Sequence, residues 1–231
     1  MILEIVVTAG VVTAVAGGLG RLGRSRAEAD WGGPWLNRLD GLNRLFCRYY
    51  HGLSAEPIPL PDKGGAIVVA NHVSGLDPFL LAAACRRPLR FMIAREQYQR
   101  WWLKWFFDAT GCIPVDRKVR AEQALRLAAA ALRAGEVVAL FPHGHIQRHD
   151  DPAHPIKAGA VRLSSYTDSP IYPNRVEGVT AKGFVILGVL IPSRARIHSF
   201  APLVCGATEL EICLEQLACI LNKAVEPERE T

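Results

Sequence analysis

Short apolar runs alternate with longer helical patterns through most of this chain. The clearest run, at residues 66–70, is wholly apolar and follows two glycines, which is typical of a buried central strand. Similar runs predict further strands at 89–93, 137–141, 170–176 and 194–200. Helical patterns fall between and after them, at 77–85, 96–107, 121–134, 157–166 and from 208 onward. This alternation predicts an α/β fold with a mixed, largely parallel sheet flanked by helices.

The size and composition of the chain exclude several other classes of protein. It has 231 residues, of which 50% are hydrophobic and 21% are charged, so it can bury a core and is not a disordered chain. The chain contains no apolar runs long enough to form the several membrane spans of a polytopic transporter, so that class is excluded. The six cysteines form no Cys-x-x-Cys pair, so we expect reduced thiols in a cytosolic setting rather than a disulfide scaffold.

The N-terminal region contains an apolar segment at residues 5–20 that carries no charge. As a helix it would be about 24 Å long, short of the roughly 30 Å hydrocarbon core of a bilayer. We therefore expect a marginal span, a re-entrant segment or an interfacial anchor. Arg21, Arg24 and Arg26 follow the segment, which predicts that the body of the protein lies on the cytoplasmic side.

A second N-terminal segment, at 35–49, has the pattern of an amphipathic helix. Its apolar side chains recur at steps of mostly three and four, with basic residues in the gaps. Such a helix can lie in a membrane interface, although packing against the protein's own core would give the same pattern. The sequence therefore predicts membrane-associating helices over 1–50 and an α/β domain over 51–231.

Positive charge and tryptophan gather in the first half of the chain. The formal net charge is +5, yet residues 86–120 alone hold 9 basic and 3 acidic side chains. All five tryptophans also lie in that half, at Trp31, Trp35, Trp101, Trp102 and Trp105. Basic charge interleaved with tryptophan suits a nucleic-acid surface or an anionic membrane interface, and a solvated basic helix with buried aromatics would look the same. The apolar N-terminal segment favours the membrane, and we expect no nucleic-acid partner.

Polar residues collect where the strand at 66–70 ends. Asn71, His72, Ser74 and Asp77 follow it directly, with Gly75 between them. The carboxyl ends of strands are where α/β sheets build their sites. A carboxylate on one imidazole nitrogen fixes the tautomer and leaves the other nitrogen as a base. His72 and Asp77 are therefore candidates for a catalytic pair, although a helix-capping Asp77 and a hydrogen-bonded His72 would have the same spacing.

Three more blocks occur at similar strand–helix junctions. They consist of Gly111, Asp116 and Arg117, then Phe141, Pro142, His143 and Gly144, and finally Pro170 to Pro173. In this order the four blocks resemble the four motifs of the glycerolipid acyltransferase family, whose best-known members are the 1-acylglycerol-3-phosphate O-acyltransferases. Residues 71–77 match all four fixed positions of the family's NHxSxxD motif. The resemblance extends over roughly residues 35–205 and implies an O-acyltransferase.

The resemblance implies a role for each matching residue. His72 would deprotonate an acceptor hydroxyl and Asp77 would orient the imidazole, so that the alkoxide attacks an acyl thioester, either acyl-CoA or acyl-ACP. Arg117 would hold the phosphate of a lysophospholipid acceptor such as 1-acylglycerol-3-phosphate. The other implied substrate-binding positions are Asn71, Ser74, Gly111, Phe141, Pro142, His143 and Gly144. No metal or redox cofactor is required, and the enzyme would serve phospholipid biosynthesis or remodelling at a membrane, with its catalytic domain on the cytoplasmic side.

The third block departs from the family pattern FPEGTR. His143 stands where the family has glutamate, His145 where it has threonine and Ile146 where it has arginine. A neutral imidazole cannot supply a fixed negative charge near pH 7, so we expect retained acyl transfer with a shifted or broader acceptor range. His149 and His154 extend the histidine cluster, which leaves a metal-dependent hydrolase as an alternative. An acyltransferase-like protein with a different acceptor or no activity is the other alternative.

Overall fold

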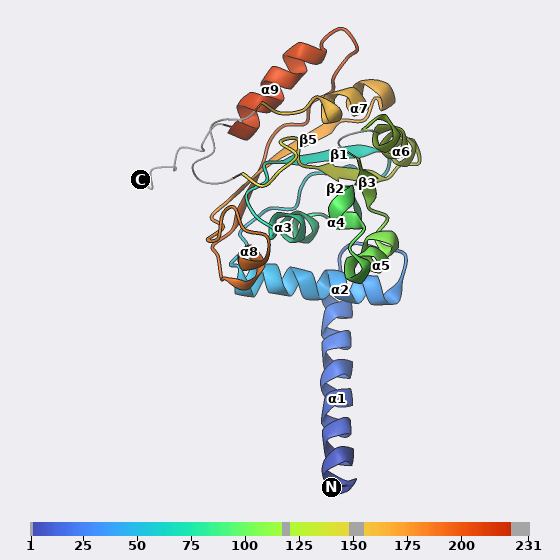
Figure 1. The fold of residues 1–231 in the computed structure, drawn as a ribbon, viewed down its shortest axis with the longest axis vertical. Helices are drawn as coiled ribbons and strands as arrows, with labels where there is room; N and C mark the ends of the chain where they lie inside the picture. Colours follow the sequence, from blue (N-terminus) through green and yellow to red (C-terminus); the bar gives the residue numbers. More distant parts are fainter. Residues whose placement is uncertain (1, 117–120, 148–154, 223–231) are drawn as a thin grey trace.

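A six-stranded sheet runs through the computed structural model, which describes residues 2–116, 121–147 and 155–222 (Figure 1). The strands are β1 (Ala66–Ala70), β2 (Leu89–Ala94), β3 (Ile113–Val115), β4 (Val137–Leu140), β5 (Ile171–Glu177) and β6 (Arg196–Ser199). Their order is β3-β2-β4-β1-β5-β6, and all neighbouring strands run parallel except β5 and β6. The predicted α/β fold with a mixed, largely parallel sheet is confirmed.

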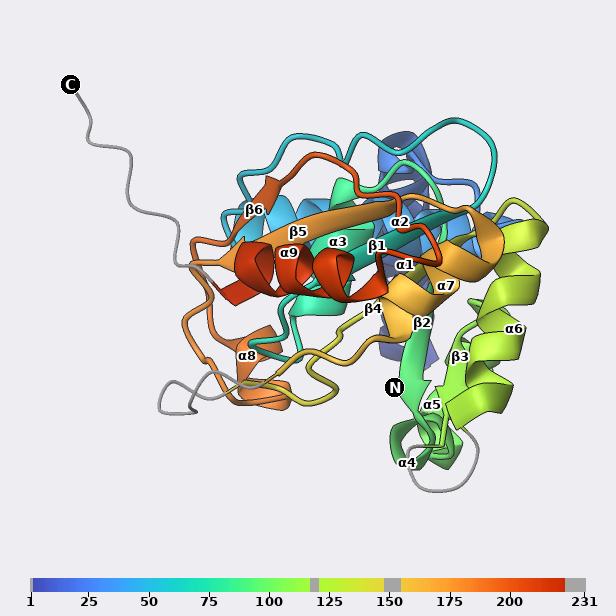
Figure 2. The same ribbon diagram turned by 90° about the horizontal axis from the view of Figure 1, so that it is seen from above.

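Helices cover both faces of this sheet. The helices of the described residues are α1 (Ile2–Arg26), α2 (Pro34–Leu45), the π-helical turn η1 (Phe46–Tyr50), α3 (Asp77–Ala84), α4 (Arg95–Tyr98), α5 (Trp101–Ala109), α6 (Ala121–Arg133), α7 (Gly159–Thr167), α8 (Ile186–Leu190) and α9 (Leu210–Asn222), and not all of them contact the sheet. Seen from above, α6, α7 and α9 lie over one face (Figure 2). The opposite face packs against α3 and η1.

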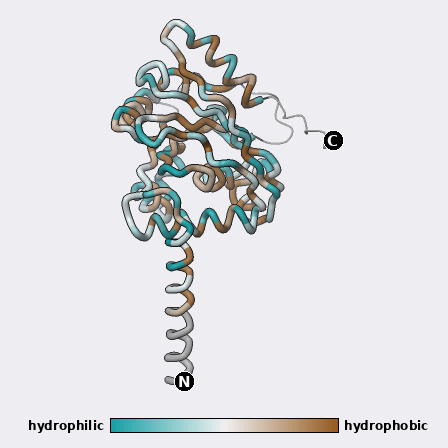
Figure 3. The backbone as a smooth tube through the Cα atoms, turned by 180° about the vertical axis from the view of Figure 1, so that it is seen from behind, coloured by the Kyte–Doolittle hydropathy of each residue, from teal (hydrophilic) through white to brown (hydrophobic). Residues whose placement is uncertain are grey.

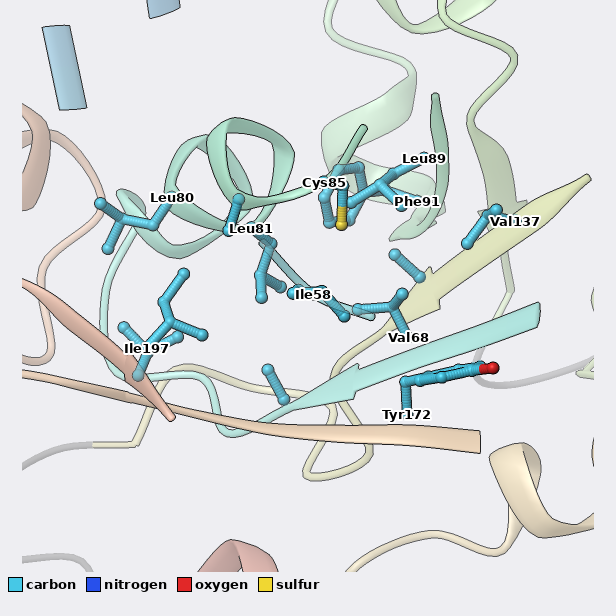
Figure 4. Packing of buried hydrophobic residues seen from close by; sticks show 14 of the residues in the cluster. Ile58, Val68, Leu80, Leu81, Cys85, Leu89, Phe91, Val137, Tyr172 and Ile197 are labelled. Carbon is cyan, nitrogen blue, oxygen red and sulfur yellow. The ribbon is translucent and has the colours of Figure 1, made fainter. Parts of the chain in front are cut away.

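The central strand β1 explains why the fold needs helices on both sides. All five of its residues are buried, and its side chains alternate between two hydrophobic cores. Val68 belongs to the core beneath α3, which Figure 4 shows with Leu80 and Leu81 packed above it. Ile67 and Val69 belong to the core covered by α6, α7 and α9. The polar loop that follows β1 is therefore held on a strand fixed from both sides.

Three local features differ from the sequence predictions. The helix expected over 96–107 is two helices, α4 and α5, because the backbone of Arg100 is extended between them. Strand β3 was not among the predicted strands, since it has three residues and contains Pro114, which only an edge position tolerates. Helix α8 was also not predicted, because a five-residue apolar run does not distinguish a helix from a strand by its periodicity.

Helix α1 extends away from the α/β body, and α2 packs across its C-terminal end (Figure 1). The two helices touch backbone to backbone, because a Cβ atom on Gly41 would overlap the carbonyl oxygen of Gly23. The buried carboxylate of Asp40 accepts hydrogen bonds from the backbone N–H groups of Glu28 and Ala29, at 3.0 and 3.3 Å. The helix predicted over 35–49 is thus confirmed as α2 followed by η1, with hydrophobic and hydrophilic positions alternating along it (Figure 3).

No helix in the described part of the chain combines the length and the apolarity that crossing a membrane requires. The predicted N-terminal membrane anchor therefore finds no support as a spanning helix.

Cys205 and Cys213 form a disulfide that joins α9 to the preceding loop, with their Cα atoms 5.9 Å apart. The prediction that all cysteines are reduced thiols is therefore wrong for this pair, because the docking of α9 brings the two together and no cysteine spacing reveals that docking. The free cysteines are Cys47, Cys85 and Cys112, which are buried, and Cys219, which is exposed. Desolvation by burial raises the pKa of both Cys47 and Cys85 to about 12.

Thiol titration checks this assignment. We expect a thiol reagent such as DTNB to modify only Cys219 in the native chain, because the other free thiols are buried and two have high pKa values. Unfolding without a reductant should expose the four free thiols, and the remaining two should appear only after reduction. Cys219→Ser should abolish the native signal, and six reactive thiols in the unreduced, unfolded chain would contradict the disulfide.

Candidate active site

The candidate active site lies where β1 ends and α3 begins. His72 and Asp77 are five residues apart, and the turn between them places the imidazole Nδ1 atom 2.8 Å from the Asp77 Oδ2 atom. The Asp77 side chain is fully buried, whereas that of His72 is 18% exposed. With Asp77 ionised, Nδ1 carries the proton and Nε2 is the nitrogen that can accept one. The pair has the geometry of a base and its orienting carboxylate.

The Asp77 carboxylate organises the whole turn around His72. Its Oδ2 atom also accepts hydrogen bonds from the backbone N–H groups of Val73 and Ser74, at 2.6 and 2.9 Å. The Ser74 hydroxyl donates to Oδ1 at 3.1 Å. Asp77 stands in the first turn of α3, and no side chain caps that helix. The carboxylate turns back to the loop instead, which excludes the helix-cap explanation of the spacing.

Two further residues of the first motif hold this loop in place. The Asn71 amide bridges to β5, donating to the carbonyl oxygen of Val176 at 2.9 Å and accepting from its N–H at 2.7 Å. Ser74 is fully buried, and its hydroxyl accepts a hydrogen bond from the N–H of Leu76 at 3.0 Å. The structure therefore assigns both side chains to contacts within the fold, and their contact with substrate stays a prediction.

The third block lies beside His72, because β4 is the parallel neighbour of β1 and both strands end at the same edge of the sheet. The Phe141 ring stacks on the His72 imidazole, with the centroids 4.1 Å apart and the planes 14° apart. The N–H of Gln147 donates to the carbonyl oxygen of His72 at 2.7 Å. Pro142 is buried, and its carbonyl oxygen accepts from the N–H of Lys157 at 3.0 Å. The loop over 141–147 therefore forms one wall of the site.

His143, which replaces the family's glutamate, lies inside this wall. Its side chain is 2% exposed, and its Nε2 atom is 3.1 Å from the Asn222 Oδ1 atom at the end of α9. Gly144 follows with φ near +76°, a value that glycine adopts without strain. A Cβ atom there would come within 2.8 Å of Lys157 Nζ. The imidazole of His145 is turned toward the main chain, with Nδ1 3.1 Å from the His143 carbonyl oxygen.

The residues of the second block lie at opposite ends of strand β3. Gly111 precedes β3 and so lies at its amino end, where its φ of +65° forms the turn after α5. The structure does not bring Gly111 to His72, since His72 follows the carboxyl end of β1. Asp116 lies at the carboxyl end of β3, and its carboxylate accepts a hydrogen bond from Arg95 at 3.2 Å. Arg117 comes next in the chain and lies outside the described residues.

A cavity of about 270 Å³ opens beside Asp116 and is lined in part by Arg95 and Lys104. The cavity lies at the carboxyl end of β3, where Pro114 and Asp116 line it. Strands β2 and β4 separate β3 from β1. Three steps between neighbouring strands amount to about 14 Å. The cavity and the His72 loop are therefore separate parts of the same edge of the sheet.

The fourth block forms the other flank of β1. Pro173 of β5 pairs in register with Val69, and Asn174 pairs with Ala70. The segment after β5 then returns to the loop over 71–77, where the N–H of Gly183 donates to the Val73 carbonyl oxygen at 2.8 Å. Sequence analysis did not find this last contact, and only the glycines at 75, 183 and 188 could have indicated a close approach of two backbones.

The alternative of a metal site gains nothing from the described residues. Among residues 2–116, 121–147 and 155–222, no group of three or more His, Cys, Asp or Glu side chains is arranged to hold a metal ion. His149 and His154 of the predicted cluster lie outside these ranges.

Comparison with known proteins connects this geometry to a family. A family model described as "Acyltransferase" matches residues 54–177. The 1-acyl-sn-glycerol-3-phosphate acyltransferase of Bacillus subtilis is 26% identical over 120 residues, which is 52% of this chain and 59% of that protein. The probable 1-acyl-sn-glycerol-3-phosphate acyltransferase of Mycoplasma pneumoniae is 31% identical over 133 residues, which is 54% of this chain and 48% of that protein. The chain therefore matches about half the length of these curated relatives.

A solved structure shares the fold. The crystal structure of the 1-acyl-sn-glycerophosphate (LPA) acyltransferase PlsC from Thermotoga maritima superposes with a TM-score of 0.62, covering 84% of this chain and 82% of that one. Sequence identity is 20%. At this level the similarity shows a common α/β architecture.

Proposed function

This chain belongs to the acyltransferase family, and from that premise we propose that it transfers a fatty acyl group from acyl-CoA or acyl-ACP to a hydroxyl of a lysophospholipid-type acceptor. 1-Acylglycerol-3-phosphate is the acceptor that the names of the relatives suggest. The reaction would serve phospholipid biosynthesis or remodelling. The single observation that carries the proposal is the His72–Asp77 pair, held at 2.8 Å at the end of the central strand.

In the proposed reaction, Nε2 of His72 takes the proton of the acceptor hydroxyl while the oxygen attacks the thioester carbonyl. A C–O bond forms, and the tetrahedral intermediate then collapses with cleavage of the C–S bond. The imidazolium returns its proton to the leaving thiolate, so that the acyl ester and the free thiol are the products. Asp77 keeps Nδ1 protonated throughout and stabilises the imidazolium that forms. Because the thioester is already activated and the base is neutral imidazole, the chemistry calls for no metal or redox cofactor.

An assay on the full chain tests this proposal. Radiolabelled acyl-CoA and acyl-ACP would be supplied separately with a panel of lysophospholipids and sugar phosphates. We expect labelled diacyl phospholipid and one equivalent of free thiol from at least one lysophospholipid. Because His143 removes a carboxylate from the third motif, we expect an acceptor range broader than lysophosphatidic acid alone. Hydrolysis that disappears on chelation and returns with zinc would contradict the acyltransferase proposal.

Arg117 is proposed to bind the phosphate of the acceptor, as its place in the second motif implies. Arg117→Ala should raise the KM for the acceptor at least about tenfold, because a hydrogen-bonded ion pair is lost, while the KM for the thioester stays unchanged. Arg126→Ala, at an exposed position on α6, is the matched control and should change neither constant. A rise in the thioester KM alone would assign Arg117 to the coenzyme phosphates instead.

We also propose that the enzyme acts at an anionic membrane surface with its catalytic domain on the cytoplasmic side. Exposed aromatic side chains support a surface contact, since Trp101, Trp102 and Trp105 on α5 are 87%, 50% and 58% exposed. The ring centroids of Trp105 on α5 and Trp35 on α2 are 5.7 Å apart. The two helices therefore share one aromatic surface. The proposed division is membrane-associating helices over 1–50 and the acyltransferase domain over 51–231.

A further inference from the structure

The segment around α8 carries a run of exposed apolar side chains outside the region that the family model matches. Six large apolar side chains there are between 37% and 68% exposed, and we call them the α8 surface: Phe184, Val185, Ile186, Leu187, Leu190 and Ile191. Adjacent exposed apolar residues of this number are unusual on a soluble face and mark a surface that contacts a partner or a lipid.

The backbone of this segment is bonded to the catalytic loop. The N–H of Gly75 donates to the carbonyl oxygen of Phe184 at 3.1 Å, and the N–H of Gly183 donates to that of Val73 at 2.8 Å. Gly188 faces Ser74 so closely that a Cβ atom on it would lie 2.9 Å from the Ser74 Cβ. Whatever covers the α8 surface therefore lies next to the residues that hold Asp77.

The same segment is also bonded to the N-terminal helices. The Tyr50 hydroxyl at the end of η1 donates to the Leu190 carbonyl oxygen at 2.6 Å, and Nε2 of His51 lies 3.2 Å from the Val189 carbonyl oxygen. In Figure 1, α5 and α8 flank α2 on the side of the body from which α1 extends. The α8 surface and the aromatic surface of α2 and α5 therefore lie on the same side of the body, toward opposite ends of α2 (Figure 1).

The charged residues that flank the α8 segment in sequence are positive. Exposed Lys182 precedes it and exposed Arg194 follows it, whereas Arg196 further on pairs in register with Glu177 of β5. No Asp or Glu occurs from residue 178 to residue 208. An apolar centre with cationic ends complements an anionic lipid surface, in which apolar side chains enter the acyl region and cations meet the headgroups.

We propose that the α8 surface inserts into an anionic membrane next to the catalytic loop. Its side chains replace lipid at the boundary between headgroups and acyl chains, and the backbone contacts with residues 73–75 then hold the His72 loop at the membrane surface. The acceptor's hydroxyl reaches His72 while its acyl chain stays in the bilayer. The last step rests on the proposed function, whereas the insertion itself does not.

Vesicle binding tests the insertion independently of catalysis. The full chain carrying Ile186→Ser and Leu190→Ser would be compared with one carrying Val204→Ser and Ile212→Ser. The paired sites match in exposure, at 68% and 60% against 67% and 58%. On vesicles of phosphatidylcholine with phosphatidylglycerol, we expect the α8 pair to bind about tenfold more weakly than wild type, from the loss of two inserted aliphatic side chains. The control pair and His72→Ala should bind like wild type.

Acyl transfer gives the second readout. With the acceptor in vesicles, the α8 pair should lose activity about as much as it loses binding, whereas a short-chain, monomeric acceptor should be used at the wild-type rate. Unchanged vesicle binding by the α8 pair would overturn the proposal. Unchanged vesicle binding together with a change in oligomeric state, or with a raised KM for acyl-ACP, would assign the surface to a second copy or to the carrier protein. Failure of the proposed function would instead leave the difference in binding without any acyl transfer.

Discussion

Replacing His72 with alanine is expected to lower kcat for acyl transfer by at least about 10²-fold, the usual scale for loss of a general base. The imidazole is the partly exposed member of the pair, and among the described residues no other imidazole at the end of β1 is bonded to a buried carboxylate. The measurement is steady-state acyl transfer at saturating acceptor and thioester, with folding checked by circular dichroism. Since the His72 ring stacks on Phe141, the variant should also show a modest fall in Tm.

His198→Ala is the control for this experiment. His198 lies on β6 with a side chain that is 39% exposed, and it stands outside the loops that form the site. The control variant should keep wild-type turnover and vesicle binding. If His72→Ala turned over at close to the wild-type rate, His72 would not be the base, and the assignment of the reaction to this site would fail.

Asp77→Asn is also expected to be severe, with a loss in kcat on the order of 10⁴-fold, as found where an orienting carboxylate becomes an amide. The amide can donate to Nδ1, which would move the imidazole proton to Nε2 and remove the base. The amide also has one acceptor oxygen where the carboxylate has two. Four donor groups, from His72, Val73 and Ser74, bond to the carboxylate, and the amide cannot accept from all of them. The loop should therefore lose stability as well, by about 1–3 kcal/mol for each donor left unpaired.

Nitrogen NMR of the His72 ring separates the chemical effect from the structural one. We expect the proton on Nδ1 in the wild type and on Nε2 in Asp77→Asn. Ser74→Ala is the comparison variant, because it removes one hydroxyl donor to Oδ1 and leaves the bond between His72 and Asp77 in place. It should destabilise the loop without moving the ring proton. If Asp77→Asn kept the wild-type tautomer and still lost activity, Asp77 would act through loop structure rather than through His72.

The sheet could be predicted from sequence because its central strands are buried on both faces. Residues 66–70 and 137–140 must be apolar at every position to satisfy two cores, and a continuous apolar run is visible without any alignment. Edge strand β3 and helix α8 could not be predicted in this way. Their residues are few, and several face solvent or a neighbouring loop, so no period appears.

The candidate site could be predicted to a similar extent. His72 and Asp77 are separated by one tight turn, so their meeting depends on local geometry that sequence spacing can indicate. The burial of His143 against Asn222 depends on a helix that begins some 67 residues later, since α9 starts at Leu210. Gly111 lies away from the site because it adjoins the amino end of β3. A sequence motif does not specify which end of a strand its residues adjoin.

The backbone contact between Gly23 and Gly41 fixes the orientation of α1 relative to α2, so that α1 is not a flexible connection. Two helices that meet without intervening side chains have little room to roll over one another, and Asp40 ties the chain leaving α1 to α2 at the same place. The direction in which α1 leaves the α/β body is then determined at this crossing (Figure 1). A bulkier residue at position 41 would force the two helices apart and change the direction of α1, although position 41 lies outside the loops that form the candidate site.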